Sequence, residues 1–228
     1  MLKVQLIINK ISGKFTCLFF CLICNIIYIS QAYSLINNIP NSIQQLIVVK
    51  PFNRFQAQIF LWQKRNNTWI KSTLAIPAVV GSQGVVAPEF KFEGDQKTPT
   101  GLYSLGPVFA TQAFKVKMDF KYVTAQDKYI DDPNSSNYNQ WITGNTAAKS
   151  FEIMDRKDGI YDAGIIINYN TAPIIKNKGS AIFMHIWYGP NIGTTGCVAV
   201  SKDNILKIVK WLDKKQNPAI LILNYMVK

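Results

Sequence analysis

The sequence predicts a mainly β domain with one clear α-helix close to its C-terminal end. Short runs rich in Val, Ile, Phe, Trp and Tyr are separated by Asn, Gly and Pro, which is typical of β-hairpins. Helical periodicity stands out in one segment, Ser201–Asp213. Of the 228 residues, 48% are hydrophobic and 12% are aromatic, which excludes a disordered chain.

The first 32 residues have the layout of a secretory signal peptide. The apolar run Phe15–Ile29 follows three lysines and precedes Ser30-Gln31-Ala32, a small-x-small cleavage pattern. The run is shorter than the roughly 20 apolar residues that a membrane-spanning helix needs. An uncleaved N-terminal anchor is the alternative. The sequence therefore predicts three parts, a leader over 1–32, a polar spacer over 33–44 and one globular domain over 45–228, in a periplasmic, secreted or cell-wall-associated protein.

The first half of the domain is expected to be mostly sheet. Its apolar or alternating runs are punctuated by Asn66-Asn67, Gly81, Gly84 and Pro88, where the chain can turn. The strands expected here are 45–50, 57–63, 68–74, 78–80, 85–87 and 102–104.

A long polar segment, Lys121–Trp141, divides this half from the rest, and we expect it to be a loop that is either disordered or shapes a binding site. Its carboxylates Asp131 and Asp132, like Asp95 upstream, are expected to be solvated. Beyond it, 164–169 and 181–187 are predicted buried strands, the helix follows with Ser201 as its N-cap, and 219–227 is a final strand.

The chain is strongly basic, with a formal net charge of +12. Removal of residues 1–32 would leave 22 basic and 13 acidic residues, a net charge of +9. This charge attracts polyanions, acidic cell-wall polymers among them. The lysines are scattered singly and no zinc-finger spacing or recognition-helix pattern occurs, so no nucleic-acid partner is expected.

One cysteine and one histidine stand out as a reactive pair. His185 is the only histidine, and Cys197, twelve residues later, is the only cysteine outside the first 24 residues. A thiol needs a nearby base to act as a nucleophile at neutral pH, and neutral imidazole suits that task. A buried, inert cysteine is the alternative, but the Gly-Thr-Thr-Gly sequence before Cys197 favours a surface loop.

The loop between the two residues supplies the other parts of an acyl-transfer site. Acyl transfer through cysteine needs amide donors for the oxyanion, and the backbone amides of Gly196 and Cys197 are placed for this role. A backbone carbonyl can orient the imidazole where no carboxylate is at hand. Gly196 is therefore a candidate substrate-binding residue beside Cys197 and His185, and Thr194 and Thr195 of the same loop are the other candidates.

Two segments resemble the YkuD-type L,D-transpeptidases, bacterial enzymes of peptidoglycan. Phe183-Met184-His185 followed by Thr194-Thr195-Gly196-Cys197 resembles the family's histidine and Ser/Thr-x-Gly-Cys motif. Upstream, 93–103 (EGDQKTPTGLY) resembles its Gly-Asp-x-x-Thr-Pro-x-Gly-x-(Phe/Tyr) segment, and Tyr161-Asp162 and 179–183 fit a subgroup. The similarity runs from about Gln45 to the C-terminus.

The resemblance implies a β-sandwich-like catalytic domain with a few short helices, one of them after the cysteine. Cys197 would attack the carbonyl of the L-centre of a stem tetrapeptide, with His185 as general base, Thr194 lining the site and the amides of Gly196 and Cys197 binding the oxyanion. Peptidoglycan stem peptides are the implied partners and carbapenems the implied inhibitors. No metal or organic cofactor is implied, and the sequence names no protein partner.

The chain departs from the family pattern at three places. Many members have His and Arg or Asn where this chain has Thr195 and Ala199, and His185 is followed by Ile186 where Gly is common. These differences affect how an acceptor would be bound. The expected nucleophile Cys197 and base His185 are present despite them. The alternatives to a transpeptidase are an L,D-carboxypeptidase on the same scaffold and a non-catalytic cell-wall-binding module.

Overall fold

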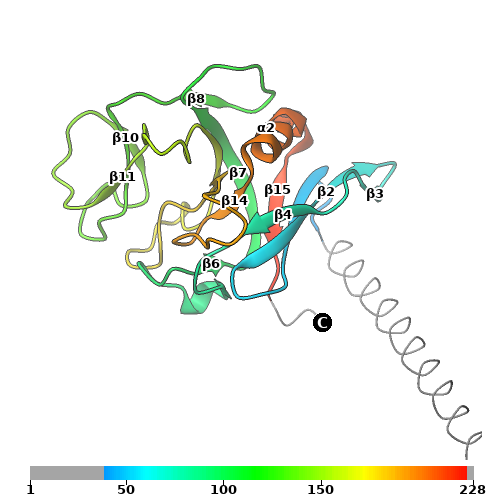
Figure 1. Ribbon diagram of the computed structural model, residues 1–228, viewed down its shortest axis with the longest axis horizontal. Helices are drawn as coiled ribbons and strands as arrows, with labels where there is room; N and C mark the ends of the chain where they lie inside the picture. Colours follow the sequence, from blue (N-terminus) through cyan, green and yellow to red (C-terminus); the bar gives the residue numbers. More distant parts are fainter. Residues whose placement is uncertain (1–38, 225–228) are drawn as a thin grey trace, which may run out of the picture. The chain divides into compact units, whose positions relative to one another are not determined.

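The computed structural model describes residues 39–224, and the compact unit that it defines is a β domain with one α-helix. Figure 1 shows the order of its elements along the chain. The first six strands are β1 (Gln45–Pro51), β2 (Gln56–Arg65), β3 (Thr68–Lys71), β4 (Ile76–Val79), β5 (Val85–Val86) and β6 (Thr98–Pro99). The next five are β7 (Gly101–Ala110), β8 (Phe120–Tyr122), β9 (Asp127–Ile130), β10 (Trp141–Thr143) and β11 (Phe151–Ile153). The last four are β12 (Ala163–Ile167), β13 (Phe183–Ile186), β14 (Val198–Val200) and β15 (Ala219–Ile222). The helix α2 (Lys202–Trp211) lies between β14 and β15, and short 3-10 helices occur at Pro88–Phe90 and Lys214–Gln216.

The main sheet has ten strands and closes on itself. Its strand order is β1-β15-β7-β12-β13-β14-β4-β2-β3, β8 is added beside β7, and β1 also pairs with β2. This last pairing joins β1, at one end of the path, to β2, the strand before its other end, so β1 and β2 have strand partners on both sides. The predicted mainly β, sandwich-like fold is confirmed in this barrel-like form.

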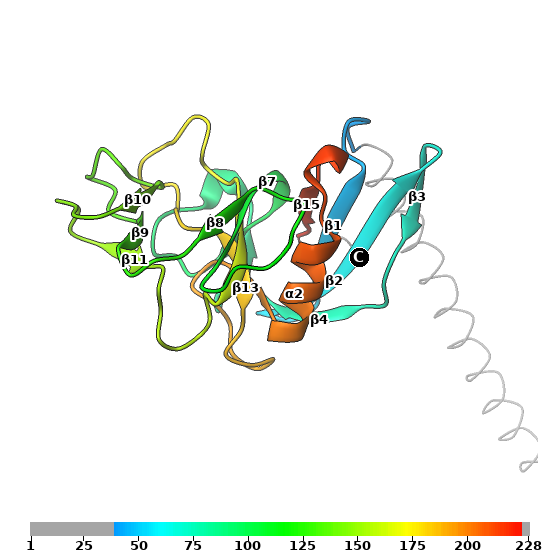
Figure 2. The same cartoon turned by 90° about the horizontal axis from the view of Figure 1, so that it is seen from above.

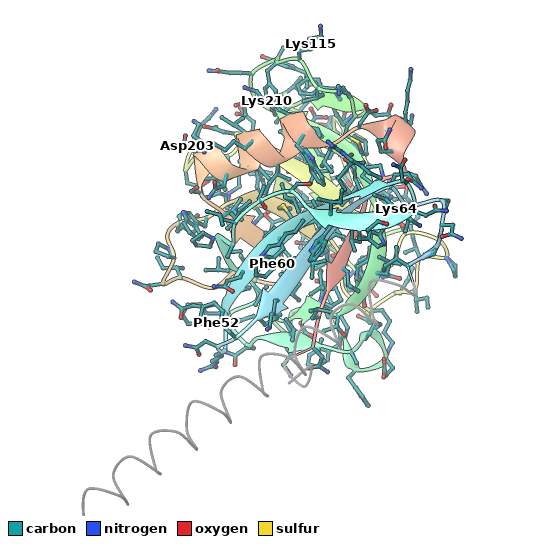
Figure 3. All side chains as sticks on the ribbon, turned by 90° about the vertical axis from the view of Figure 1, so that its right-hand side faces the viewer. Phe52, Phe60, Lys64, Lys115, Asp203 and Lys210 are labelled. Atoms are coloured by element: carbon teal, nitrogen blue, oxygen red, sulfur yellow. The ribbon has the colours of Figure 1, made fainter. Side chains whose placement is uncertain are left out.

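Helix α2 covers one face of this sheet, as Figure 2 shows from above. Ser201 caps its start by accepting a hydrogen bond from the amide of Asn204. Ile205, Ile208 and Val209 lie on one side of the helix and are buried against sheet residues such as Val198. In Figure 3 the labelled side chains of Asp203 and Lys210 lie on the helix, away from the labelled Phe60 and Lys64 on β2. The predicted helix after Cys197 and its Ser201 cap are both confirmed.

A second, smaller sheet packs on the other face of β7, β12 and β13. Its order is β10-β9-β11, and Tyr129 on β9 and Met154 just after β11 share a buried cluster with Phe109, Phe183 and Cys197. Side chains alternate between the two faces of β13, so the strand contributes to two buried clusters. Met184 and Ile186 belong to the cluster under α2, whereas Phe183 faces the small sheet. Cys197 therefore lies between the two sheets.

The segment Lys121–Trp141 was predicted to be a loop, and this is wrong. It contains β9 and part of β8 and β10, because Asp127, Tyr129 and Ile130 are buried in the small sheet. Its polar composition hid the strands, since Asp127 is buried through hydrogen bonds rather than exposed. Sequence patterns also missed β11 and β14, which have three residues each. The final strand is shorter than predicted and ends at Ile222.

The predicted leader over 1–32 and the first half of the predicted spacer, 33–38, lie outside the described residues. Within residues 39–224, no helix has the length and apolar character needed to cross a membrane.

Candidate active site

Adjacent parallel strands bring His185 and Cys197 to the same face of the main sheet. In the register of β13 and β14, Met184 is opposite Val198 and His185 is opposite Ala199. One step back, Cys197 adjoins Phe183, whose amide donates to the Cys197 sulfur at 3.3 Å. Because side chains alternate between faces, the histidine ring and the thiol are diagonal neighbours on the side of the small sheet.

Cys197 is a buried thiol with two backbone contacts. It is 5% exposed, its Sγ accepts the Phe183 amide, and its S–H donates to the Ala181 carbonyl at 3.2 Å. Burial raises the pKa of the thiol from 9.0 to about 12. Among the described residues, the sulfur forms hydrogen bonds with these backbone groups and not with the His185 ring. Because its pKa is raised, the resting thiol is protonated.

His185 is a neutral imidazole held by a backbone contact. Its Nδ1 lies 2.8 Å from the carbonyl oxygen of Ile186, so Nδ1 carries the proton and donates, which leaves Nε2 as an acceptor. The backbone carbonyl thus fills the orienting role for which no carboxylate could be named. Burial lowers the pKa of His185 from 6.5 to about 4. The ring stands edge-on to Tyr161 at a centroid distance of 5.2 Å.

Thr194 fixes the backbone around Cys197. Its hydroxyl donates to the Cys197 carbonyl at 2.6 Å and accepts the amide of Gly196 at 3.1 Å. The Gly196 amide is therefore used inside the loop, and the Cys197 amide is left as the candidate oxyanion donor of the two. Gly196 has φ +147, and a Cβ there would lie 3.2 Å from the Lys97 carbonyl oxygen. Thr195 is exposed.

Thr98 is a second hydroxyl on the same carbonyl, and sequence reasoning gave it no role. It is fully buried, accepts the Gly81 amide at 2.8 Å and donates to the Cys197 carbonyl at 3.1 Å. Thr98 belongs to the segment 93–103 that carries the family resemblance, which was the available signal. Thr98 and Thr194 together hold the chain segment from which the thiol projects.

A charged and aromatic group beside His185 was also missed. Tyr161 donates to Glu152 Oε2 at 3.4 Å, and the Arg156 guanidinium lies 5.3 Å from the centroid of the Tyr161 ring. Arg156 also contacts Glu152 at 3.2 Å and Asp158 at 2.5 Å. Burial raises the pKa of Glu152, and Arg156 opposes that shift.

The predicted exposure of Asp95 and Asp132 is wrong. Asp95 is 8% exposed and pairs with the buried Lys91 at 2.8 Å. Asp132 is 6% exposed, and its carboxylate accepts the amides of Asn134 and Lys149 at 2.9 and 2.8 Å. Both carboxylates hold loops in place, because backbone and lysine donors replace the water that they lose. Among residues 39–224, no three His, Cys, Asp or Glu side chains converge to hold a metal ion.

A known protein family matches most of this chain. The sequence profile of the L,D-transpeptidase catalytic domain (YkuD) matches residues 46–221. A crystal structure of the helical cell shape determining protein Pgp2 from Campylobacter jejuni has a TM-score of 0.40 and 15% identity, covering 78% of this chain and 47% of that one. Its K307A mutant has a TM-score of 0.42 and 15% identity, covering 78% and 46%.

The chain spans about half the length of these two Pgp2 chains. A search of curated proteins gives no match. The family profile carries the assignment, since it covers most of the chain and includes both members of the reactive pair. The chain belongs to the YkuD family of L,D-transpeptidase catalytic domains.

Proposed function

We propose that the protein is an exported peptidoglycan L,D-transpeptidase that works through a thioester on Cys197. The single observation that carries the proposal is the placement of Cys197 and His185 on one face of the paired strands β13 and β14. His185 Nε2 is the free acceptor of a neutral ring, as a general base requires. Family membership supplies the reaction class, and the leader-like segment 1–32 supports export to the periplasm or cell wall.

In the proposed reaction, Cys197 rotates from the Ala181 carbonyl and gives its proton to His185 as it attacks the L-centre carbonyl of a stem tetrapeptide. The C–S bond forms, the Cys197 amide binds the oxyanion, and the terminal D-amino acid leaves with the proton from His185. Deprotonation accompanies attack, because burial disfavours both the thiolate and the imidazolium at rest. An amine on a second stem peptide then displaces the thiol. Thr194 and Thr98 keep the Cys197 backbone in place through both steps.

Purified protein incubated with a disaccharide-tetrapeptide tests this function. Cross-linked dimers or exchange of the terminal D-amino acid are expected, and Cys197→Ala is expected to abolish both. Thr68→Val, an exposed threonine on β3, is the control for handling and folding. Wild-type protein that gives neither product, beside an equally inactive Cys197→Ala, contradicts the proposal. Tripeptide without cross-links would instead assign the chain to the carboxypeptidases.

A further inference from the structure

The backbone takes an unusual conformation just before it enters β13. Ala181, two residues before that strand, has φ +52, in the left-handed region that residues with a Cβ rarely adopt. Glycine adopts this region freely, whereas the Cβ of alanine makes it costly. Such a conformation persists only where its surroundings hold it, and it is most frequent at functional sites. Contacts around Ala181 therefore have to stabilise it.

One buried side chain supplies these contacts. Asn139 lies in the loop between β9 and β10 and is 3% exposed. Its Oδ1 accepts the amide of Ala181 at 3.0 Å, and its Nδ2 donates to the carbonyls of Tyr169 and Asn170 at 3.1 and 2.6 Å. The Asn139 amide donates to the carbonyl of Ile130 at 2.8 Å, which fixes its own backbone. Because both N–H donors and the oxygen of the side chain are engaged, its orientation is fixed as well.

The carbonyl of Ala181 contacts the nucleophile. It accepts the S–H of Cys197 at 3.2 Å, while the amide of Phe183 donates to the same sulfur at 3.3 Å. Asn139 thus holds the amide of the residue whose carbonyl holds the thiol. The backbone angles of Ala181 connect these two contacts, because they set the direction of its carbonyl relative to its amide. A change in the conformation of Ala181 would turn that carbonyl away from the sulfur.

We propose that Asn139 is a positioning residue for Cys197, which holds Ala181 in its left-handed conformation and so keeps the resting thiol on the Ala181 carbonyl rather than on the ring of His185. This inference rests on the proposed function for the role of Cys197 as the nucleophile. Attack on a substrate then requires the thiol to leave the carbonyl. Without the side chain of Asn139, Ala181 relaxes toward the conformations that alanine prefers, and the thiol loses its acceptor.

Alkylation of the resting thiol tests this role without needing catalysis. Asn139→Gly removes the side chain without straining the backbone, because Asn139 itself has φ +57 and glycine adopts this value readily. In folded, full-length Asn139→Gly at pH 8, iodoacetamide should label the peptide containing Cys197 at least about fivefold faster than in wild type. Urea unfolding gives the labelling rate that global unfolding alone would produce, and the expected rate exceeds it.

A second substitution separates positioning from simple support of the loop. Ala181→Gly, added to Asn139→Gly, should slow the labelling again, because glycine adopts φ +52 without the Asn139 contact. Ala181→Gly alone completes the cycle, and the effect of Asn139→Gly should be smaller in that background. Asn67→Gly is the matched control. Asn67 is exposed in the turn between β2 and β3, has φ +59, and its replacement should leave labelling of Cys197 at the wild-type rate.

Two results would overturn the inference. One is labelling of Asn139→Gly no faster than its global unfolding allows, and the other is an increase that Ala181→Gly does not reverse. Thioester formation by a wild type whose Asn139→Gly variant gives either result would reject the positioning role and leave the transpeptidase standing. Labelling rates that follow the cycle, in a protein that never forms a thioester with the disaccharide-tetrapeptide, would sustain the positioning role and reject the transpeptidase.

Discussion

The hydroxyl of Thr98 donates a hydrogen bond of 3.1 Å to the carbonyl oxygen of Cys197, which lies 99 residues further along the chain. The same hydroxyl accepts the Gly81 amide, so it ties β6 both to the loop that follows β4 and to Cys197. Thr194, three residues before Cys197, donates to the same oxygen. The position of the thiol therefore depends on a residue far from its own motif.

Replacing Thr98 by Val should impair both stability and thioester formation. The change leaves the buried Gly81 amide without its acceptor, which costs about 1–3 kcal/mol in the free energy of unfolding. It also removes one of the two hydroxyls on the Cys197 carbonyl. Urea unfolding and the acylation rate at a temperature where the variant stays folded measure the two effects. Thr68→Val on exposed β3 should stay within about 0.5 kcal/mol, and an unchanged acylation rate in Thr98→Val would contradict the positioning role.

Among the carboxylates of the small sheet, Asp127 should contribute most to stability. Although burial alone would raise the pKa of Asp127, hydrogen bonds from Thr143, Trp141 and Thr124 lower it from 3.8 to about 2. Its stabilising contribution is therefore present above pH 3.8 and lost as pH falls through about 2. Asp127→Asn should cost about 1–3 kcal/mol at pH 7 and flatten acid unfolding between those values. Asp119→Asn is the exposed control, and an equally small effect at both positions would refute this role for Asp127.

The acid limb of thioester formation should report the lowered pKa of His185. A general base must be neutral, so activity should rise with pH through about 4 and be flat across pH 5 to 7. The rate of acylation at subsaturating substrate, followed from pH 3.5 to 7, measures this. An acid limb centred near the ordinary value of 6.5 would show that the ring is solvated in the working enzyme.

The same burial gives His185 a signature in stability. Between pH 6.5 and about 4 the unfolded chain binds a proton on this ring that the folded chain does not bind. The free energy of unfolding should therefore fall as pH falls through that window, and His185→Gln should remove this part of the slope. Equilibrium unfolding of wild type and His185→Gln at a series of pH values measures this difference in slope. If the free energies of unfolding of the two proteins change in parallel with pH, His185 does not make this contribution.

The resting thiol of Cys197 should react slowly with small alkylating agents. Its side chain is nearly buried and burial raises its pKa to about 12, so little thiolate is present at pH 8. Iodoacetamide should label the peptide containing Cys197 at least about tenfold slower than free cysteine, and fully in urea. Digestion and mass spectrometry separate this peptide from the other cysteines. Labelling of the folded protein at the free-cysteine rate would mean that the sulfur is open at rest.

Local patterns were sufficient to predict much of the fold. The helix was predictable because Ser201 and the apolar side that contains Ile205 and Ile208 follow helical rules over ten residues. Most strands of the main sheet were predictable from their β-branched and aromatic residues, but the three-residue β14 was not. The small sheet was not, because β10 and β11 have three residues each and their burial depends on partners distant in sequence.

The candidate site, like the fold, could be predicted from the sequence only in part. Residue type and spacing pointed to His185 and Cys197, since the chain offers few alternatives for this chemistry. The roles of Thr98 and Glu152 depend on long-range register, which no local pattern encodes. Sequence reasoning also gave the Gly196 amide to the oxyanion, whereas the structure commits it to Thr194, because a hydroxyl two residues earlier folds back onto it.

Intact-protein mass after exposure to a carbapenem tests the central claim most directly, namely that His185 activates Cys197. The account predicts one covalent adduct, located on the peptide containing Cys197, absent in Cys197→Ala and formed much more slowly in His185→Gln. Wild-type protein that stays unmodified, or that is modified at an unchanged rate in His185→Gln, would contradict it.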